Sequence, residues 1–278
     1  MQVLVTVVLL TAIFATTIIG HKTPKDELYQ YRQRIKNSYS HLKKGTKYAM
    51  RINEELLEDL EKCRKATAPR PPTENSDCQS YYESGYRRAG IYEINPPNSE
   101  LPPFSVWCDF LSGHGWTVIQ RSTNGPVNFT RLWDQYKEGF GDLSGEHWLG
   151  NDRIHELTLT NHILNIYMTA DDKGPAAGTW QNFRVANETD NYQLTLSGAG
   201  YAGDLIDYFT EHHDGMQFST ADNDNDEGVG NRSCAIDHKA GWWYSGCGQV
   251  GLNSESQSGM FWRDYYPSSS AVMRITRE

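Results

Sequence analysis

The pattern of apolar and polar positions along the 278 residues begins with one long apolar run. Residues 3–20 are almost wholly apolar, and the polar residues 21–24 end the run. An apolar stretch that ends in small residues is typical of a secretory signal peptide, so we expect residues 1–20 to be one. An uncleaved anchor is the alternative, because about 18 apolar residues can just span a bilayer. The threonines within the run favour cleavage.

Residues 21–66 are predicted to form a short helical stem. One column of positions recurs there at strict seven-residue intervals and holds Leu28, Ile35, Leu42, Ala49, Leu56 and Cys63. Such a column stays on one side of a helix and marks a candidate coiled-coil seam. The second column of the heptad is poor, and Gly45 weakens the middle of the helix by about 1 kcal/mol relative to Ala. A weak self-associating helix and a solvated helical linker both fit this pattern.

The pattern changes again after a proline-rich segment, residues 67–76, which indicates a stiff linker. In residues 77–278, short β-rich runs separated by Gly, Asn and Pro are found at 116–120, 163–168 and 192–196. Helical periodicity is confined to 129–136 and 152–157. This arrangement predicts an α+β domain with a central antiparallel sheet and long loops.

Charge separates the stem from the domain. Residues 21–70 contain 13 Lys and Arg against 7 Asp and Glu, whereas the whole chain contains 26 against 35. A basic stem therefore precedes an acidic domain. This balance argues against a nucleic-acid-binding protein, which needs a basic face to displace counterions from phosphates.

Cysteines and glycosylation motifs support export of the chain. Asn-X-Ser/Thr motifs predict glycosylation at Asn128, Asn187 and Asn231. Four of the five cysteines lie in the domain, and Cys63 ends the stem. This division predicts two internal disulfides and one interchain thiol, although spacing alone leaves three internal pairings open. Because Cys63 occupies the heptad column, a disulfide between stems would lock a homo-oligomer.

The domain contains a series of specific motifs in a fixed order: Gly90-Ile-Tyr-Glu-Ile94, Phe104-Ser-Val-Trp-Cys-Asp109, Gly145-Glu-His-Trp-Leu-Gly-Asn151, Asp222-Asn-Asp-Asn-Asp226 and Gly241-Trp-Trp-Tyr244. This series, which runs from Asp77 to the C-terminus, closely resembles the fibrinogen C-terminal (fibrinogen-related) domain family of ficolins, tachylectins, angiopoietins and fibrinogen-like proteins. The resemblance implies an N-terminal lobe, a central sheet and a loop-rich calcium- and ligand-binding region. It also implies the disulfides Cys78–Cys108 and Cys234–Cys247.

The alternating aspartates of 222–226 predict a calcium site. Carboxylates crowded on one short segment repel each other unless a cation neutralises them, and Ca²⁺ prefers oxygen ligands of this kind. A solvated acidic turn is the alternative. The resemblance implies that Asp224 and Asp226 bind Ca²⁺ through their side chains. It also implies that the backbone carbonyls of about Gly228 and Gly230 complete the shell.

The resemblance implies that relatives which bind acetylated sugars use a pocket beside the second disulfide, built from a Cys-His pair and from aromatic residues further along. In this chain Gly248 follows the cysteine instead, and the segment 253–262 is shorter. Aromatic rings can still hold sugars and acetyl groups. The predicted ligand contacts are therefore Tyr244, Gly248, Tyr265 and Tyr266. Trp242 and Trp243 are expected in the core.

No catalytic group is expected. Residues 198–203 match the dinucleotide fingerprint but lack its βαβ context. The adjacent His212 and His213 diverge and do not have metal-ligand spacing.

The resemblance implies a secreted, calcium-binding recognition protein of innate immunity that binds a glycan or an acetylated surface ligand. The alternative is an extracellular ligand for a receptor or matrix protein, which the missing Cys-His pair favours. Neither reading requires nucleic acid or membrane insertion.

Overall fold

The computed structural model describes residues 29–30, 32–34, 53–54, 56–62 and 74–277, apart from 124, 171–172, 229–231, 256–258 and 264–267. The chain divides into two compact units, residues 1–70 and 71–278. The predicted signal peptide, Cys63 and most of the predicted linker lie outside the described residues. Among the residues that are described, no helix is long and apolar enough to cross a membrane.

In the first unit, the described stem residues are helical. Lys62 pairs with Glu58 one turn earlier, with 3.0 Å between the ammonium nitrogen and the carboxylate. Arg34 pairs with Asp59. A straight helix would hold positions 34 and 59 about 37 Å apart, so the described helical pieces are not parts of one straight helix. These contacts lie within one chain, so association of stems between chains stays a prediction.

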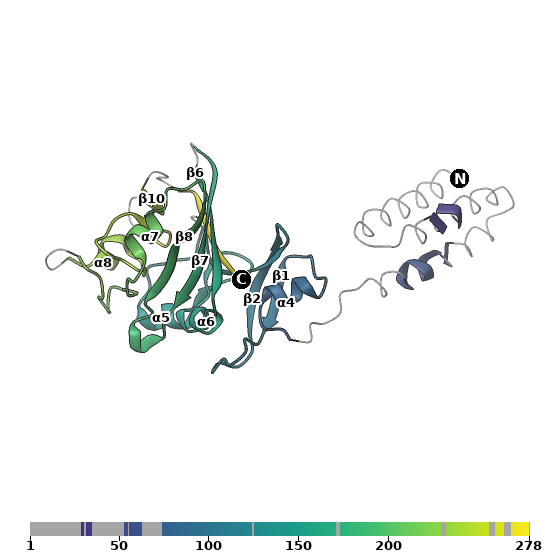
Figure 1. Cartoon of the computed structure of the whole chain (residues 1–278), viewed down its shortest axis with the longest axis horizontal. Coiled ribbons are helices and arrows are strands. Elements are labelled where there is room, and N and C mark those ends of the chain that lie inside the picture. Colours follow the sequence, from purple (N-terminus) through teal and green to yellow (C-terminus); the bar gives the residue numbers. More distant parts are fainter. Residues whose placement is uncertain are drawn as a thin grey trace. The chain divides into compact units, whose positions relative to one another are not determined.

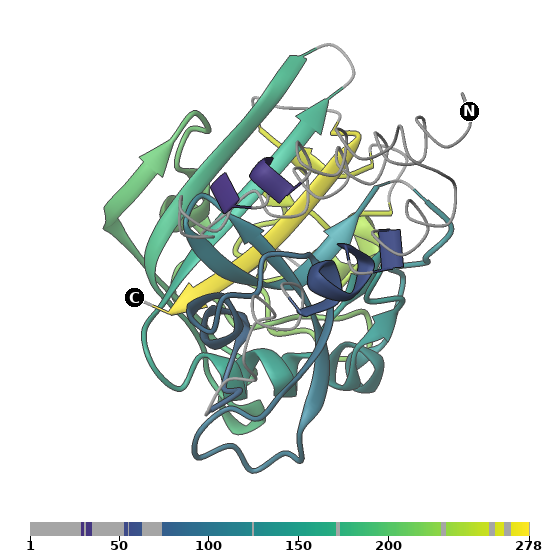
Figure 2. The ribbon, with the colours of Figure 1, turned by 90° about the vertical axis from the view of Figure 1, so that its right-hand side faces the viewer.

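The second unit is built on one large antiparallel sheet. Its described strands follow the order β1-β2-β3-β11-β6-β7-β8, with β4 and β5 attached beside β3. Their bounds are β1 Gly90–Ile94, β2 Phe104–Leu111, β3 His114–Ser122, β4 Phe140–Gly141, β5 His147–Trp148, β6 His162–Ala170, β7 Lys173–Val185, β8 Leu194–Gly203 and β11 Ser270–Arg277. The C-terminal strand β11 therefore lies inside the sheet, between β3 and β6 (Figure 2).

Short helices and a small second sheet complete the unit. The helices are α4 Cys78–Glu83, α5 Trp133–Glu138, α6 Asn151–Leu157, α7 Tyr208–His213, α8 Cys234–His238 and the 3₁₀ turn η2 Glu188–Asp190. The small sheet pairs β9 Val250–Gly251 with β10 Phe261–Trp262. Figure 1 shows α4, β1 and β2 at one end of this unit and α7, α8 and β10 at the other, with β6, β7 and β8 between them. The predicted α+β class is confirmed.

The sequence predicted one helix too long. The run 129–136 was expected to be helical, but α5 begins only at Trp133. The Asn128 side chain accepts a hydrogen bond from the Thr130 backbone N–H at 2.7 Å, and Leu132 is extended, with φ −89° and ψ 173°. Asn side chains compete in this way with helical hydrogen bonding, so they favour a turn before the helix.

The core extends from the sheet into the loop-rich end. Along β6, the alternate residues Leu164, Ile166 and Met168 are fully buried, as expected for a strand with one face on the core. Trp242 and Trp243 are also fully buried, which confirms their expected place. Their rings lie 5.3 Å apart between centroids. Aromatic contacts of this kind join the loops to the sheet.

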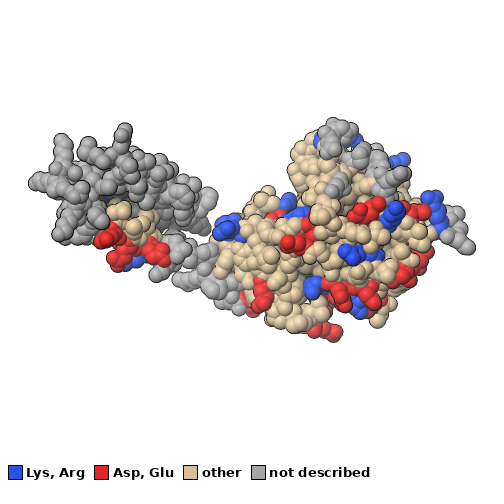
Figure 3. Space-filling view, turned by 180° about the vertical axis from the view of Figure 1, so that it is seen from behind, with Lys and Arg blue, Asp and Glu red and all other residues tan. Residues whose placement is uncertain are grey.

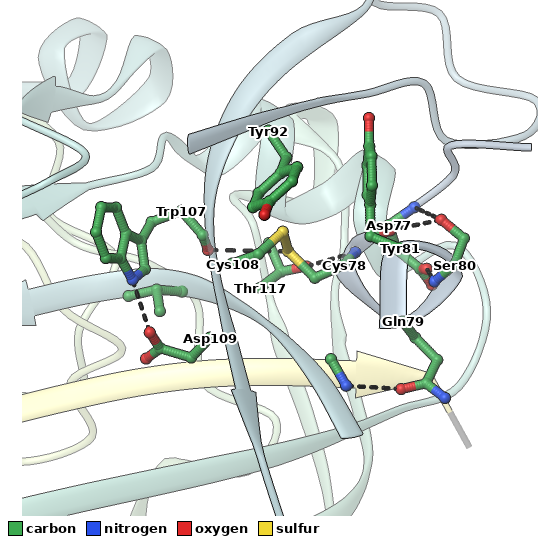
Figure 4. Close-up of a disulfide and its surroundings, with 12 residues drawn as sticks. Asp77, Cys78, Gln79, Ser80, Tyr81, Tyr92, Trp107, Cys108, Asp109 and Thr117 are labelled. Carbon is green, nitrogen blue, oxygen red and sulfur yellow. Dashed lines mark hydrogen bonds between the residues drawn. A yellow bond between two sulfur atoms is a disulfide. The ribbon is translucent and has the colours of Figure 1, made fainter. Parts of the chain in front are cut away.

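The first disulfide, Cys78–Cys108, fastens α4 to β2 (Figure 4). Asp77 caps α4 by accepting a 2.7 Å hydrogen bond from the Ser80 N–H. Gly115 of β3 lets α4 approach closely, because an added Cβ would lie 2.1 Å from the Cys78 carbonyl oxygen. This disulfide is the one that the resemblance implied for Cys78.

Charged side chains are mixed on the surface of the second unit. On the face shown in Figure 3, the Lys and Arg side chains of the described residues are separated by acidic and uncharged ones. That face presents no continuous basic area of the kind that binds nucleic acid.

Candidate functional site

Three aspartates of the predicted calcium loop have different structural roles. Asp222 accepts hydrogen bonds from the Trp133 N–H at 3.0 Å and from the Thr220 hydroxyl at 2.7 Å. It therefore supports the first residue of α5. This role fits the expectation that Asp224 and Asp226, rather than Asp222, supply the calcium ligands.

Asp226 ties the loop to the start of α8. Its two carboxylate oxygens accept hydrogen bonds from the Gly228 and Cys234 N–H groups, both at 2.8 Å. Position 228 has no room for a side chain, because a Cβ there would lie 2.5 Å from the Arg232 carbonyl oxygen. The loop is thus held closely against the residue that begins the second disulfide.

The carboxyl groups of Asp224 and Asp226 interact with each other. Burial raises the pKa of the Asp226 carboxyl, the N–H groups of Gly228 and Cys234 lower it, and the neighbouring Asp224 carboxyl raises it again, with a net increase. A cation would relieve this repulsion and stabilise both carboxylates. The described residues contain no group of three or more His, Cys, Asp or Glu side chains placed to hold a metal ion together. Two side chains fit Ca²⁺ only together with backbone carbonyls or water.

The second disulfide joins Cys234 of α8 to Cys247, the other pair that the resemblance implied. The loop that contains Cys247 is bonded directly to the predicted calcium loop, because the Glu227 N–H donates to the Ser245 carbonyl at 2.8 Å. Cys247 has a φ of +60°, which is uncommon for a residue with a side chain. The next residue, Gly248, is exposed. The two loops therefore form one connected surface.

Tyr244 lies deeper than the sequence-based prediction placed it. The side chain is 1% exposed, and its hydroxyl donates to the Ala240 carbonyl at 3.1 Å. Burial raises its pKa well above the ordinary value. The cause is the tight packing of this end of the core, so the ring does not face a ligand from the surface. Tyr265, Tyr266 and Gly230 lie outside the described residues.

His238 is a residue of this site that the sequence analysis missed. One ring nitrogen lies 2.7 Å from the Cys247 carbonyl oxygen, and the ring stacks on Tyr244 with centroids 5.5 Å apart. It thereby supports the loop that carries Gly248. Its position in the sequence between Cys234 and Cys247 could have indicated that it belongs to this site.

Two predicted glycosylation positions are accessible. Asn128 and Asn187 are exposed, and the Asn187 side chain accepts a 2.7 Å hydrogen bond from the Thr189 hydroxyl. Asn231 falls outside the described residues. Exposure permits modification by a bulky glycan, and glycosylation itself stays a prediction.

The two motifs that could suggest catalysis have ordinary structural surroundings. Residues 198–203 lie within β8, which pairs antiparallel with β7, so they do not form a phosphate-binding turn between a strand and a helix. His213 is fully buried and lies 2.7 Å from the Trp243 carbonyl oxygen, whereas the side chain of His212 is 29% exposed. These two rings do not share a ligand position.

Comparison with known proteins gives one consistent result. Residues 74–276 match the family described as "Fibrinogen beta and gamma chains, C-terminal globular domain". Mouse fibrinogen-like protein 1 is 36% identical over 225 residues, which cover 72% of this chain and 71% of that protein. Mouse angiopoietin-related protein 1 is 39% identical over 212 residues, which cover 72% of this chain and 42% of that protein.

Solved structures agree with these sequence matches. The fibrinogen-like globe domain of human ANGPTL2 has a TM-score of 0.67 and 37% identity, and the match covers 73% of this chain and 98% of that one. A lamprey fibrin D-dimer, complexed with the peptide Gly-His-Arg-Pro-amide, has a TM-score of 0.66 and 29% identity over 90% of this chain and 92% of that one.

Proposed function

The chain belongs to the family of fibrinogen C-terminal globular domains, and from this premise we propose that it is a secreted, non-enzymatic protein that binds an extracellular protein partner through its loop-rich end. The observation that carries this proposal is the position of Tyr244 in the core. With Tyr244 buried and Gly248 in place of the histidine, the aromatic pocket expected for acetylated sugars loses two of its parts. A surface without that aromatic pocket suits a protein partner better than a small sugar.

The relatives support a protein partner. The lamprey fibrin that shares this fold was solved with a four-residue peptide bound. The matching relatives are fibrinogen-like and angiopoietin-related proteins. Because one protein of this fold binds a peptide, the fold is able to recognise a segment of another protein.

A carbohydrate-binding, lectin-like function is the second candidate. It is favoured by the Glu227–Ser245 hydrogen bond, which connects the predicted calcium loop to the exposed Gly246 and Gly248. Exposed backbone groups at glycines can donate and accept hydrogen bonds with sugar hydroxyls. A calcium-dependent sugar site at this loop would then need no aromatic pocket.

The two candidates are separated by binding of the labelled, secreted protein to glycans and to cells, each in calcium and in EDTA. Protein recognition predicts that a glycan array stays silent. It also predicts that mild protease treatment of cells abolishes binding, whereas glycosidase treatment leaves it intact. Calcium-dependent binding to acetylated sugars on the array would contradict protein recognition and support the lectin-like function.

We also propose that Ca²⁺ binds to Asp224 and Asp226, with backbone carbonyls completing the shell. The close approach of the two carboxyls supports this assignment. When bound, the ion would neutralise the two carboxylates of the loop. It would also fix the position of Asp226, whose hydrogen bond with the Cys234 N–H would hold the start of α8 in place.

Calcium should therefore raise the thermal stability of the domain. At one hundred times its dissociation constant, a ligand that binds only the folded state adds about 2.7 kcal/mol. Calorimetry in calcium and in EDTA should show this increase in wild type and not in the double variant Asp224→Ala/Asp226→Ala. Asp222→Ala is the matched control, which should lower stability in both conditions but keep the calcium effect. A double variant that retains the effect would refute the assignment.

A further inference from the structure

A separate pocket lies on α6, away from the two loops discussed above. It has a volume of about 380 Å³ and is lined by the β1–β2 connection, α6 and η2. In Figure 1, α6 lies below β7 and β8, on the side nearer to β2, whereas α8 lies at the other end of the unit. The volume falls in the range of small-ligand sites, about 300–1,000 Å³.

Four carboxylates from three segments line this pocket: Glu100, Asp152, Glu156 and Glu188. Asp152 and Glu156 are four residues apart on α6, so they share one helix face. Glu188 is neutralised by Lys137 and also accepts a 2.9 Å hydrogen bond from the Trp133 indole. The other three carboxylates form no ion pair with a described residue. Lys137 also interacts electrostatically with Asp152, so four carboxylates are set against one lysine and the pocket keeps a net negative charge.

Glu156 is the lining carboxylate with the fewest hydrogen bonds relative to its burial. It is 8% exposed, and one of its oxygens accepts a single 3.2 Å hydrogen bond from the Glu100 N–H. None of the described donors bonds to its other oxygen. Neither oxygen is among the fully buried side-chain atoms that have no partner, so the second oxygen is an open acceptor at the pocket, where a cationic donor would gain a charge-assisted hydrogen bond.

The other lining groups indicate what the compensating group is. Leu101 and Leu159 line the pocket and offer an apolar wall to a methylene stem. His155 donates from Nδ1 to the Val185 carbonyl at 2.8 Å, so in its neutral form the other nitrogen is an acceptor. Acceptors from several directions match the five N–H donors of a planar guanidinium better than a compact ammonium.

We propose that this pocket binds an arginine side chain of an extracellular partner protein. The guanidinium would compensate Glu156 and bond to Glu100 and Asp152, while its methylene groups pack on the two leucines. The Tyr192 hydroxyl already donates to one oxygen of Asp152 and holds this carboxylate in place. The site is separate from the predicted calcium loop and from the loop closed by Cys234–Cys247, so failure of either proposal leaves the other standing.

The test is an NMR titration of the full secreted protein with N-acetyl-arginine amide. N-acetyl-citrulline amide is the uncharged control of the same shape, and N-acetyl-lysine amide tests the preference for a guanidinium. We expect saturable binding of the arginine compound, weaker binding of the lysine compound and none of the citrulline compound. Glu156→Gln should weaken arginine binding about tenfold or more, because it removes a charged acceptor.

Glu100→Gln should weaken binding in the same direction and covers the case in which Glu156→Gln does not fold. Glu211→Gln is the matched control, since it removes an equal charge from α7 and should leave the affinity unchanged. Asn187→Gln should bind at least as tightly as wild type, because Asn187 stands at the pocket and would carry the predicted glycan. Absence of binding by both wild type and Asn187→Gln, equal binding of citrulline, or an equal loss in Glu211→Gln would overturn the proposal.

Discussion

His213 is a buried titratable group whose protonation opposes folding. Burial lowers its pKa from 6.5 to about 4, the Trp243 carbonyl raises it in part, and the neighbouring His212 lowers it further. Its second ring nitrogen has no hydrogen-bond partner in the described structure. The ring is therefore held neutral in the folded protein, whereas it takes up a proton below pH 6.5 when the chain unfolds.

This difference predicts a loss of stability in acid. Above pH 6.5 the ring is neutral in both states, so it adds no pH dependence. Between pH 6.5 and 4 only the unfolded state binds the proton, and the free energy of unfolding falls, by about 2 kcal/mol from pH 7.5 to pH 5. In urea unfolding, the free energy lost between pH 7.5 and pH 5 should be smaller by this amount in His213→Gln than in wild type. The His212→Gln protein should lose as much as wild type. Equal losses in all three proteins would contradict the prediction.

At the level of elements, Glu146 shows how one carboxylate shapes a loop. The side chain is 6% exposed and accepts hydrogen bonds from the N–H groups of Thr123 at 2.6 Å, Gly125 at 2.8 Å and Val127 at 3.0 Å. Burial raises the pKa of the Glu146 carboxyl, but these N–H groups outweigh burial and hold the pKa below 4.5. The residue thus fixes the loop that leaves β3.

Glu146→Gln should destabilise the domain by about 2 kcal/mol at pH 7, because charge-assisted hydrogen bonds are replaced by weaker ones and one amide hydrogen faces a donor. The wild-type advantage is fully present above pH 4.5 and is lost as the pH falls through the lower folded-state value. Denaturation at pH 7 and pH 3 measures both effects. The exposed Glu138→Gln is the control, with a change within about 0.5 kcal/mol. A Glu146→Gln protein as stable as this control at pH 7 would refute the role of the carboxylate.

At the scale of the whole molecule, we expect chains to assemble through their stems. The heptad column and Cys63 predict a disulfide between stems, and binding sites joined in this way gain avidity. A non-reducing gel of secreted wild type should show covalent multimers that disappear in Cys63→Ser. The Cys63→Ser domain should keep its melting temperature, because both internal disulfides lie in the second unit. Monomers in wild type would exclude the interchain bond.

The sequence by itself determined the class and family of the second unit. The β-rich runs at 116–120 and 163–168 became β3 and β6 because β-branched and aromatic residues favour strands. Residues 116–120 are all buried, as expected for a strand inside the sheet, whereas β6 shows alternation only in part. The motifs from Asp77 onward identified the family because they occur in a fixed order along the chain. Even the disulfide partners came from that resemblance.

Only the tertiary structure decided which polar and aromatic residues face a ligand. Tyr244 is buried because distant parts of the chain pack around it, and no local pattern reports that packing. The acidic pocket is assembled from Glu100, Asp152, Glu156 and Glu188, which come from three segments that are separated in the sequence. Exposure and proximity depend on contacts between segments that are distant in the sequence, so local sequence patterns do not predict them.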